Sequence, residues 1–309
     1  MSRKRIALVT CAALPELDAD DQPLAKALAD AGYDVSVVSW DADGVDWSGF
    51  DLAVIRSTWD YSNRPEEFLA WASSVKNVVN AAGVVKWNTD KHYLKDLAGL
   101  GVKTIDTVWL DPHKHLSSQA IHTRLPAFGD YVIKPTISAG AQDTIRYRES
   151  SAEARGKAIL HVRELLRAGR HVMVQRYLSR VDSAGESCLV YIDGVFSHAV
   201  RKDAMLQRDV VPAKGLYTPE IMTAAQATEE QYRLAEQTMD SAAKLLGIER
   251  SQLLYARVDM LPGDDDVPHL LELELTEPSL FLAQSPGSLD RLVRAIQHRL
   301  AEGAAGPAA

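Results

Sequence analysis

The sequence has few cysteines, and this scarcity excludes two kinds of architecture. Its 309 residues include 2 cysteines, Cys11 and Cys188, which lie far apart in the chain. Two distant cysteines provide neither a disulfide framework nor the clustered ligands of a zinc site. We therefore expect no disulfide, and a reduced, cytoplasmic setting.

Long hydrophobic runs and an excess of positive charge are also missing. No apolar stretch approaches the ~20 residues that a membrane-spanning helix needs. The basic start "MSRKRIALVTCAALPEL" meets charged and turn-forming residues too early for a secretory signal, and predicts a first strand over Arg5–Thr10 instead. The net charge of -8 gives no field that attracts nucleic acid or an anionic membrane. We expect partners of neither kind.

Several signatures of enzyme chemistry are absent as well. The first predicted strand is not followed by Gly-x-Gly-x-x-Gly, which argues against a dinucleotide site there. No Gly-x-Ser-x-Gly elbow or other nucleophile signature occurs. The 9 histidines show no metal-ligand spacing, and the segment His113–His115 ("HKH") is predicted to be solvated. Any reaction must therefore proceed without a recognisable covalent nucleophile.

The N-terminal part of the sequence shows an α/β pattern. Composition is ordinary for a globular protein, and the length allows two or three small domains. The segments "RIALVT", "DQPLAKALADAG", "YDVSVVSW" and "FDLAVIRSTWDY" predict strand, helix, strand and strand, which is typical of a parallel sheet. Ligands of such sheets lie at the carboxyl ends of the strands. Those ends carry "LDADD" and "RSTWDY".

These two strand-end loops are the candidate substrate site. Asp21, with its neighbours in "LDADD", can pair with an amino group, and Arg56 beside Ser57 can pair with a carboxylate. The same residues also suit helix-cap and surface positions, and both interpretations stay open.

The rest of the chain predicts mixed helices and strands. Helices are expected over 64–77, about 89–100, 150–169, within 218–248, and about 288–301. Strands are expected over 103–110, over 171–179, and on both sides of a small-residue loop within 130–148. Residues 185–204 predict a hairpin with Asp193-Gly194 at its tip.

A second predicted hairpin, within "YARVDMLPGDDDVPHLLELELTEPSL", gathers charge on one face. Tyr255, Arg257 and Asp259 alternate with apolar residues in its first strand. In its second strand Leu271, Leu273 and Leu275 are expected on one face, and Glu272, Glu274 and Thr276 on the other. A wet sheet face explains such a pattern. So does a hard cation such as Mg²⁺, which offsets the repulsion between carboxylates.

Three lysines are candidates for phosphate binding. Lys134 ends an apolar strand, where a cation is costly without an anionic partner, and the following Ser138, Ala139 and Gly140 let backbone N–H groups approach phosphate oxygens. Lys91 is expected in a first helical turn, where a bound phosphate would relieve its conflict with the helix dipole. Lys202 follows a strand. The alternatives are a lysine that snorkels out of its strand for Lys134, a solvated surface lysine for Lys91, and a strand-end surface pair with Arg201 for Lys202.

The joint order of these motifs resembles the ATP-grasp ligase superfamily. The pieces are an N-terminal parallel sheet, "DK", "VIKP" with its small-residue loop, "VQRYL", and "RVD" followed by Glu-x-Glu. "RSTWDY", "GES", "DGVFSHAVRK" and "ELELTEPSLFL" are similar to the branch with the cycloserine-forming cyclo-ligase (O-ureido-D-serine cyclo-ligase), beside bacterial glutathione synthetases. The resemblance implies an N-terminal parallel-sheet domain over 1–95, ATP-grasp lobes over 96–178 and 179–301, and a flexible tail over 302–309.

The resemblance also implies a role for each site residue. Lys91, Lys134 and Lys202 would hold ATP phosphates beneath the loop that contains Ser138, Ala139 and Gly140. The adenine pocket would be lined by Gln175, Arg176, Tyr177 and Leu178. Arg257 and Lys134 would be catalytic, and Mg²⁺ (or Mn²⁺) would be held by Asp259, Glu272 and Glu274. Glu277 falls outside this set and is predicted to face substrate, together with Arg56, Ser57 and Asp21 of the strand-end loops.

One departure from the superfamily concerns the last metal ligand. The superfamily commonly has Asn in a Glu-x-Asn pair, whereas this chain offers Glu272-Leu-Glu274 or Glu274-Leu-Thr276. We favour the first pair, because it keeps two carboxylates.

The implied function is an ATP- and Mg²⁺-dependent carboxylate–amine ligase of antibiotic biosynthesis. It would form an amide through an acyl phosphate and release ADP and phosphate from ATP and a small amino-acid-like substrate. Ring closure and intermolecular ligation both stay open, as does a homodimer. The alternatives are a ligase that adds amino acids to a peptide or protein, and a nucleotide-binding protein without turnover.

Overall fold

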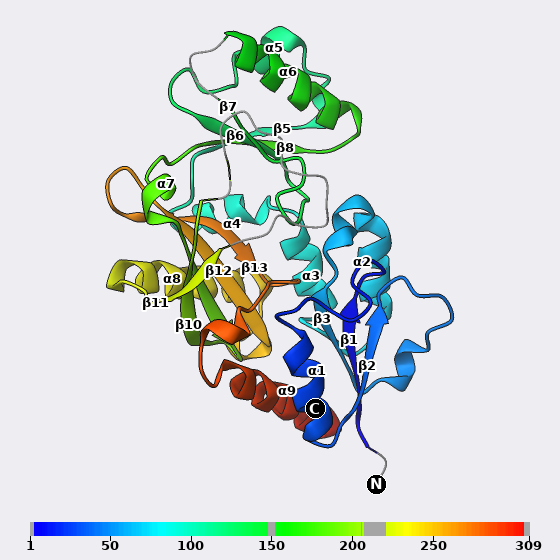
Figure 1. Ribbon diagram of the computed structural model, residues 1–309. Helices are drawn as coiled ribbons and strands as arrows, with labels where there is room; N and C mark the ends of the chain where they lie inside the picture. The colour runs from blue at the N-terminus through cyan, green and yellow to red at the C-terminus, as the bar shows by residue number, and fades with distance from the viewer. Residues whose placement is uncertain (1–2, 148–151, 205, 207–220, 306–309) are drawn as a thin grey trace.

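The computed structural model describes residues 3–147, 152–204, 206 and 221–305. Within these residues the chain forms three β-sheets, one parallel and two antiparallel. In Figure 1 the parallel sheet lies at the lower right, one antiparallel sheet at the lower left, and the other at the top. The predicted combination of an N-terminal parallel sheet with two further lobes is confirmed.

The parallel sheet has the strand order β2-β1-β3-β4. Its strands are β1 (Arg5–Thr10), β2 (Asp34–Ser39), β3 (Leu52–Ser57) and β4 (Val78–Val79), and it is flanked by α1 (Gln22–Asp30) and α2 (Pro65–Ser74). Short 3₁₀ turns η1 (Trp47–Gly49) and η2 (Trp59–Asn63) precede and follow β3. Strands β1 and β3 are almost wholly buried, as their continuous apolar runs predict.

The upper antiparallel sheet has the order β5-β8-β6-β7. Its strands are β5 (Thr107–Leu110), β6 (Tyr131–Pro135), β7 (Ile145–Tyr147) and β8 (Val172–Arg176). The helices α5 (Ser118–His122) and α6 (Ala152–Arg167) pack on it, and η3 (Pro112–Lys114) follows β5. Most of its buried residues form a core of their own, but Met173 of β8 belongs to the cluster of the lower antiparallel sheet.

The second antiparallel sheet has the order β11-β10-β9-β12-β13. Its strands are β9 (Glu186–Ile192), β10 (Val195–Lys202), β11 (Met222–Ala225), β12 (Tyr255–Pro262) and β13 (Pro268–Glu274). Around it lie α7 (Val181–Ala184), α8 (Glu229–Leu246) and η4 (Arg250–Gln252). Both predicted hairpins are present, β9–β10 and β12–β13.

Three predicted helices need correction. The helical pattern within 218–248 begins only at Glu229, where Thr228 and Gln231 form a capping box, and it is preceded by β11. The helix expected over about 89–100 begins only at Tyr93 (α4, Tyr93–Gly99), and the turn expected before it contains a further helix, α3 (Ala82–Thr89). The last helix, α9 (Ser288–Ala305), follows η5 (Leu282–Gln284) and continues into the predicted tail, whose residues 306–309 lie outside the described part of the chain.

Packing divides the chain differently from the predicted boundary at residue 95. Tyr93, Leu94 and Leu97 of α4 pack with β12 and β13 rather than with the parallel sheet. Conversely, Leu292 and Ile296 of α9 pack with β1 and α1. The domain limits therefore stay predictions. No helix in the described ranges has the length and apolar character to cross a membrane.

Candidate active site

A cavity of about 620 Å³ lies where the three sheets meet. Its wall takes Asp18 and Trp59 from the parallel-sheet side, Lys134 and Gln175 from the upper sheet, and Arg257 from the lower one. All the predicted phosphate, adenine, metal and catalytic residues line it, together with Glu277: Lys91, Lys134, Ser138, Ala139, Gly140, Gln175, Arg176, Tyr177, Leu178, Lys202, Arg257, Asp259, Glu272, Glu274 and Glu277. The structure thus brings together residues that span most of the sequence.

The register of the β12–β13 hairpin sets the acidic side of the cavity. Arg257 lies opposite Glu274, and Asp259 lies opposite Glu272. The register shifts between Asp259 and Met260. Because of this irregularity, Leu271 lines the cavity while Leu273 enters the core, so the predicted common face of these two leucines is wrong.

Arg257 contacts two of the predicted metal-binding carboxylates. Its guanidinium donates to the Asp259 carboxylate at 2.7–3.1 Å, to Glu274, and to the Ser279 carbonyl oxygen at 3.0 Å. Burial opposes its charge, but Asp259 and Glu274 outweigh burial and raise the pKa of Arg257 well above its ordinary value. Arg257 therefore stays positive at any working pH.

Glu274 is the predicted metal ligand whose charge is least compensated in the cavity, because the pKa values of Asp259 and Glu272 are lowered and that of Glu274 is raised. Burial, with Asp259 and Glu272 nearby, raises the pKa of Glu274 well above its usual range despite the contact with Arg257. The charge of Glu274 is therefore incompletely compensated, and a hard cation with oxygen ligands would stabilise it. Thr276 instead lies against Asn88, with 3.4 Å between Thr276 Oγ1 and Asn88 Oδ1, and does not line the cavity. This geometry favours the Glu272–Glu274 pair.

The three lysines of the cavity differ in their partners. They are only 4%, 7% and 6% exposed for Lys91, Lys134 and Lys202. Lys91 Nζ lies 2.9 Å from Glu272 Oε1 and donates to the Ser138 carbonyl oxygen at 2.8 Å. Lys202 Nζ lies 2.9 Å from Glu186 Oε1. These two cations are already neutralised by carboxylates.

Lys134 is the exception. Among the described residues the structure shows no ion pair or hydrogen bond for its ammonium group. Burial lowers the pKa of Lys134 to about 8, although Glu272 partly opposes this effect. A buried lysine that faces a cavity without an anion is poised to receive one.

The position of Lys91 corrects the sequence prediction. Lys91 lies between α3 and α4, not in a first helical turn. Its backbone N–H donates to the Thr136 carbonyl oxygen at 3.0 Å. This bond ties Lys91 to the loop that follows β6, so relief of a helix dipole does not explain its place.

Part of the cavity lining is apolar. Gln175–Leu178 runs along it at the end of β8, and Gln175 Nε2 donates to Thr107 Oγ1 at 3.0 Å. Its walls are completed by the apolar side chains of Ile105, Val132, Val181, Leu261 and Leu271. Apolar walls with adjacent backbone polar groups are suited to a flat heterocycle.

Three predicted substrate residues lie behind the cavity wall. Arg56 Nε donates to Asp21 Oδ1 at 2.8 Å, and Ser57 Oγ donates to Asp21 Oδ2 at 3.0 Å. Among the described residues that line the cavity, none of these three is found. Instead Asp18 lines it, and the Asp18 N–H donates to Ser57 Oγ at 3.0 Å. Arg56, Asp21 and Ser57 thus position the loop, and their substrate contacts remain a prediction.

Glu277 is held between the parallel sheet and the hairpin. Its backbone carbonyl oxygen accepts a hydrogen bond from Trp59 Nε1 at 3.1 Å, and its side chain bonds Tyr61. Burial raises the pKa of Glu277 to about 7, although the Tyr61 bond opposes this effect.

Sequence reasoning missed Glu186 and Trp59 as cavity residues. A signal for Glu186 was present, because the β9–β10 hairpin pairs it directly with Lys202. The same register leaves Arg201 exposed and paired with Asp203 at 3.1 Å, away from the cavity. Trp59 carried no signal beyond its place in a strand-end loop.

The fold is that of the ATP-grasp proteins. D-alanine–D-alanine ligase of Bacillus anthracis in complex with ATP superposes with a TM-score of 0.62 at 15% identity, covering 97% of this chain and 98% of that chain. A RimK-domain ATP-grasp protein of Sphaerobacter thermophilus gives 0.64 at 15% identity, covering 95% and 99%. At such identities the likeness shows the fold alone.

The chain belongs to the family of the D-cycloserine synthetase DcsG. Residues 6–82 match the model of the DcsG N-terminal domain. The cycloserine biosynthesis protein DcsG of Streptomyces lavendulae is 36% identical over 301 residues, covering 96% of this chain and 98% of the relative. The crystal structure of D-cycloserine synthetase DcsG superposes with a TM-score of 0.86, covering 96% and 99%.

The predicted class is therefore confirmed: the protein is an ATP-dependent ligase that forms carbon–nitrogen bonds. The alternative of a nucleotide-binding protein without turnover finds no support in these relatives.

Proposed function

We propose that the cavity activates a substrate carboxylate with ATP and closes a ring by joining it to a nitrogen of the same small, amino-acid-like molecule. The observation that carries this proposal is Lys134, a buried cation that faces the cavity without an anionic partner. The cavity wall around it also includes Lys91, Lys202, Arg257 and the three carboxylates predicted to bind Mg²⁺.

The first step is phosphoryl transfer to the substrate. A carboxylate oxygen attacks the γ-phosphorus of ATP in line, the bond from that phosphorus to the bridging oxygen breaks, and ADP leaves. Lys134 and Lys91 hold the phosphates, with Lys202 beside them, and the loop of Ser138, Ala139 and Gly140 covers them. Asp259, Glu272 and Glu274 would hold Mg²⁺, which would supply positive charge beside the phosphate oxygens when bound.

The second step forms the carbon–nitrogen bond. The nitrogen attacks the carbonyl carbon of the acyl phosphate, phosphate leaves, and the nitrogen loses a proton. Arg257 stabilises the negative charge that develops on the tetrahedral centre. No side chain forms a covalent bond with substrate, which agrees with the absence of a nucleophile signature.

Ring closure is supported by the relatives in this family. The relative that matches along nearly the full length is named for cycloserine biosynthesis, and the solved relative for D-cycloserine synthesis. Asp18 and Asp20 on the cavity wall offer carboxylates to the ammonium group of an amino acid. The protein would accordingly serve antibiotic biosynthesis.

The decisive experiment labels the substrate carboxylate with oxygen-18. A serine-derived amino acid with a terminal ureido group is incubated with ATP and Mg²⁺, and products are identified by mass spectrometry. We expect ADP, a cyclic amide and labelled phosphate, because the attacking oxygen leaves with phosphorus. AMP and pyrophosphate, or unlabelled phosphate, would contradict the acyl-phosphate route. Turnover only with a peptide acceptor would contradict ring closure.

A variant pair tests the cavity itself. Glu274→Gln removes a ligand charge at nearly constant volume, and we expect turnover to fall by about a hundredfold or more while the fold survives. Glu16→Gln, on an exposed residue, is the matched control. Near-normal activity of Glu274→Gln at low Mg²⁺ would show that Glu274 is not a metal ligand.

A further inference from the structure

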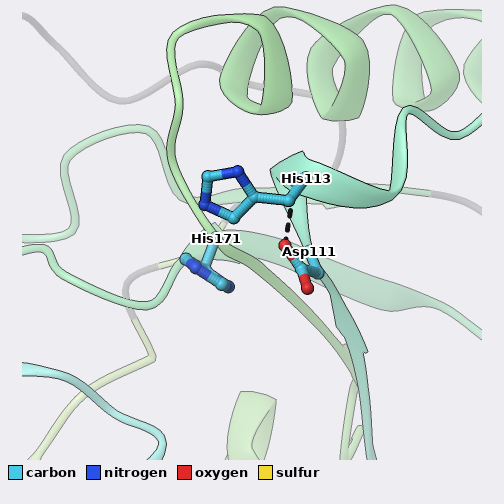
Figure 2. A group of neighbouring side chains, drawn as sticks. All are labelled: Asp111, His113 and His171. Atoms are coloured by element: carbon cyan, nitrogen blue, oxygen red, sulfur yellow. Dashed lines mark hydrogen bonds between the residues drawn. The ribbon is translucent and has the colours of Figure 1, made fainter.

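A second group of metal-ligating side chains lies at one end of the upper sheet. Figure 2 shows the imidazole rings of His113 and His171 next to each other, with the Asp111 carboxylate beside them. One ligand atom from each of the three residues lies within 4.8 Å of the others. None of the three is among the described residues that line the active-site cavity.

The strand register explains why these residues meet. Strands β5 and β8 are antiparallel, and Leu110 pairs with Val172. Asp111 directly follows Leu110, and His171 directly precedes Val172, so the two residues flank the same end of the strand pair. The 3₁₀ turn η3 then brings His113 back over this end. The group therefore joins residues 58 positions apart, which the sequence spacing of the histidines could not reveal.

Local contacts hold the three side chains in place. The backbone N–H of His113 donates to Asp111 Oδ1 at 2.9 Å, and this bond lowers the pKa of Asp111 below its usual value. The His171 ring is packed edge-on against His92 at 5.3 Å between centroids, and His92 stacks on Trp109 at 4.7 Å. The hydrogen bond that caps the turn η3 explains the position of the Asp111 side chain. It does not explain why the two histidine rings lie beside it.

We propose that Asp111, His113 and His171 form a binding site for a borderline divalent cation of the zinc type, separate from the magnesium site of the cavity. Two imidazoles and one carboxylate are ligands that Zn²⁺ and its neighbours prefer, whereas Mg²⁺ prefers oxygen ligands. Ligands of a tetrahedral zinc lie about 3.3 Å apart when each is about 2.0 Å from the metal. The three ligand atoms lie within 4.8 Å of one another, so they need to approach by at most about 1.5 Å to reach that geometry.

The site has a physical consequence for the upper lobe. Bound metal would fasten β5 to the start of β8. The His171 carbonyl oxygen accepts from the Thr136 N–H at 3.0 Å, and the Thr136 carbonyl oxygen accepts from the Lys91 N–H at 3.0 Å. Two backbone hydrogen bonds therefore connect the proposed metal site to Lys91, a predicted phosphate ligand. The inference does not depend on the proposed reaction.

The test measures zinc binding to tag-free protein by equilibrium dialysis, with Mg²⁺ in excess to occupy the cavity. We expect one bound equivalent for the natural sequence. His113→Ala and His171→Ala should each weaken binding by at least about tenfold, the loss that even an outer-shell partner causes. His115→Ala, in the same "HKH" segment but outside the group, should bind normally.

Two further measurements keep the result unambiguous. Zn²⁺ should raise the unfolding temperature of the natural sequence and of His115→Ala, but not of His113→Ala or His171→Ala. Unfolding curves without zinc show whether each variant folds. Glu186, Cys188 and Asp259 form another group of ligand atoms in or beside the cavity. If zinc binding survives both histidine substitutions, or is lost in Cys188→Ala instead, the proposed site is wrong.

Discussion

Lys134 shows how a single residue can report on the state of the cavity. Burial lowers the pKa of its ammonium group to about 8, and the negative charge of Glu272 opposes this effect only in part. A phosphate group placed beside it would reverse this effect and raise the pKa. Protonation of Lys134 and nucleotide binding are therefore coupled.

From this coupling we predict a pH dependence of ATP binding. Between about pH 8 and the higher pKa of the complex, binding should take up protons, and affinity should fall as pH rises. Calorimetric titration of ATP in buffers of different ionisation enthalpy measures the uptake directly.

The control for this prediction is Lys134→Arg, which stays charged throughout the range. It should bind ATP with a flatter pH profile, whereas Lys134→Met should bind weakly at every pH. Proton uptake near pH 8 that persists in Lys134→Met would assign the effect to another group.

At the scale of elements, the Asn88 side chain holds the β12–β13 hairpin in place. It forms the backbone hydrogen bonds that a neighbouring strand would otherwise form. Asn88 of α3 donates through Nδ2 to the Leu273 carbonyl oxygen at 2.7 Å, and accepts from the Leu275 N–H at 2.7 Å. All of these groups are buried. Their alignment fixes the strand that carries Glu272 and Glu274.

We predict that Asn88→Ala lowers the free energy of unfolding by about 1–3 kcal/mol for each buried backbone group left without a partner. It should also slow turnover, because the neighbouring carboxylates lose their alignment. Urea denaturation and an ADP-release assay measure the two effects.

Asn77→Ala is the matched control for the hairpin. Asn77 also donates to a backbone carbonyl, that of Phe50 at 3.3 Å, but it is exposed, and no described hydrogen bond joins its side chain to the hairpin. Equal losses in the two variants would show that Asn88 has no special role in the site.

At the scale of the whole molecule, the parallel sheet and the lower antiparallel sheet share one core. Leu8 of β1, Val190 of β9 and Ile296 of α9 belong to the same buried cluster. In Figure 1, α9 lies beside α1 at the bottom of the molecule, so the end of the chain returns to its beginning. The upper sheet has its own core, which contains Ile121.

This division predicts two patterns of destabilisation. Ile296→Ala should cost about 2–5 kcal/mol and increase hydrogen exchange in β1 and β12 together, because they share that core. Ile121→Ala, at a position that is equally buried, should increase exchange in β6 and β8 and leave β1 protected. A local effect of Ile296→Ala, confined to α9, would show that the shared core is not cooperative.

The sequence by itself determined the local elements and the chemical inventory. Period-two and period-3.6 patterns predicted the hairpins and most helices, because burial on one face leaves a direct trace in the order of residues. The ordered motifs around Lys134, Arg257 and Asp259 indicated the ligase class, and the relatives confirm it. A cation at a buried strand end and paired carboxylates are visible without coordinates.

Tertiary structure alone decided which of these residues face the same space. Arg56 and Asp21 neutralise each other behind the wall, whereas Lys134 faces the cavity without a partner among the described residues. The irregularity at Asp259 turned Leu271 into the cavity, and antiparallel pairing brought His171 to Asp111 across 60 positions. Such outcomes depend on registers and on contacts between distant segments, and no local periodicity encodes them.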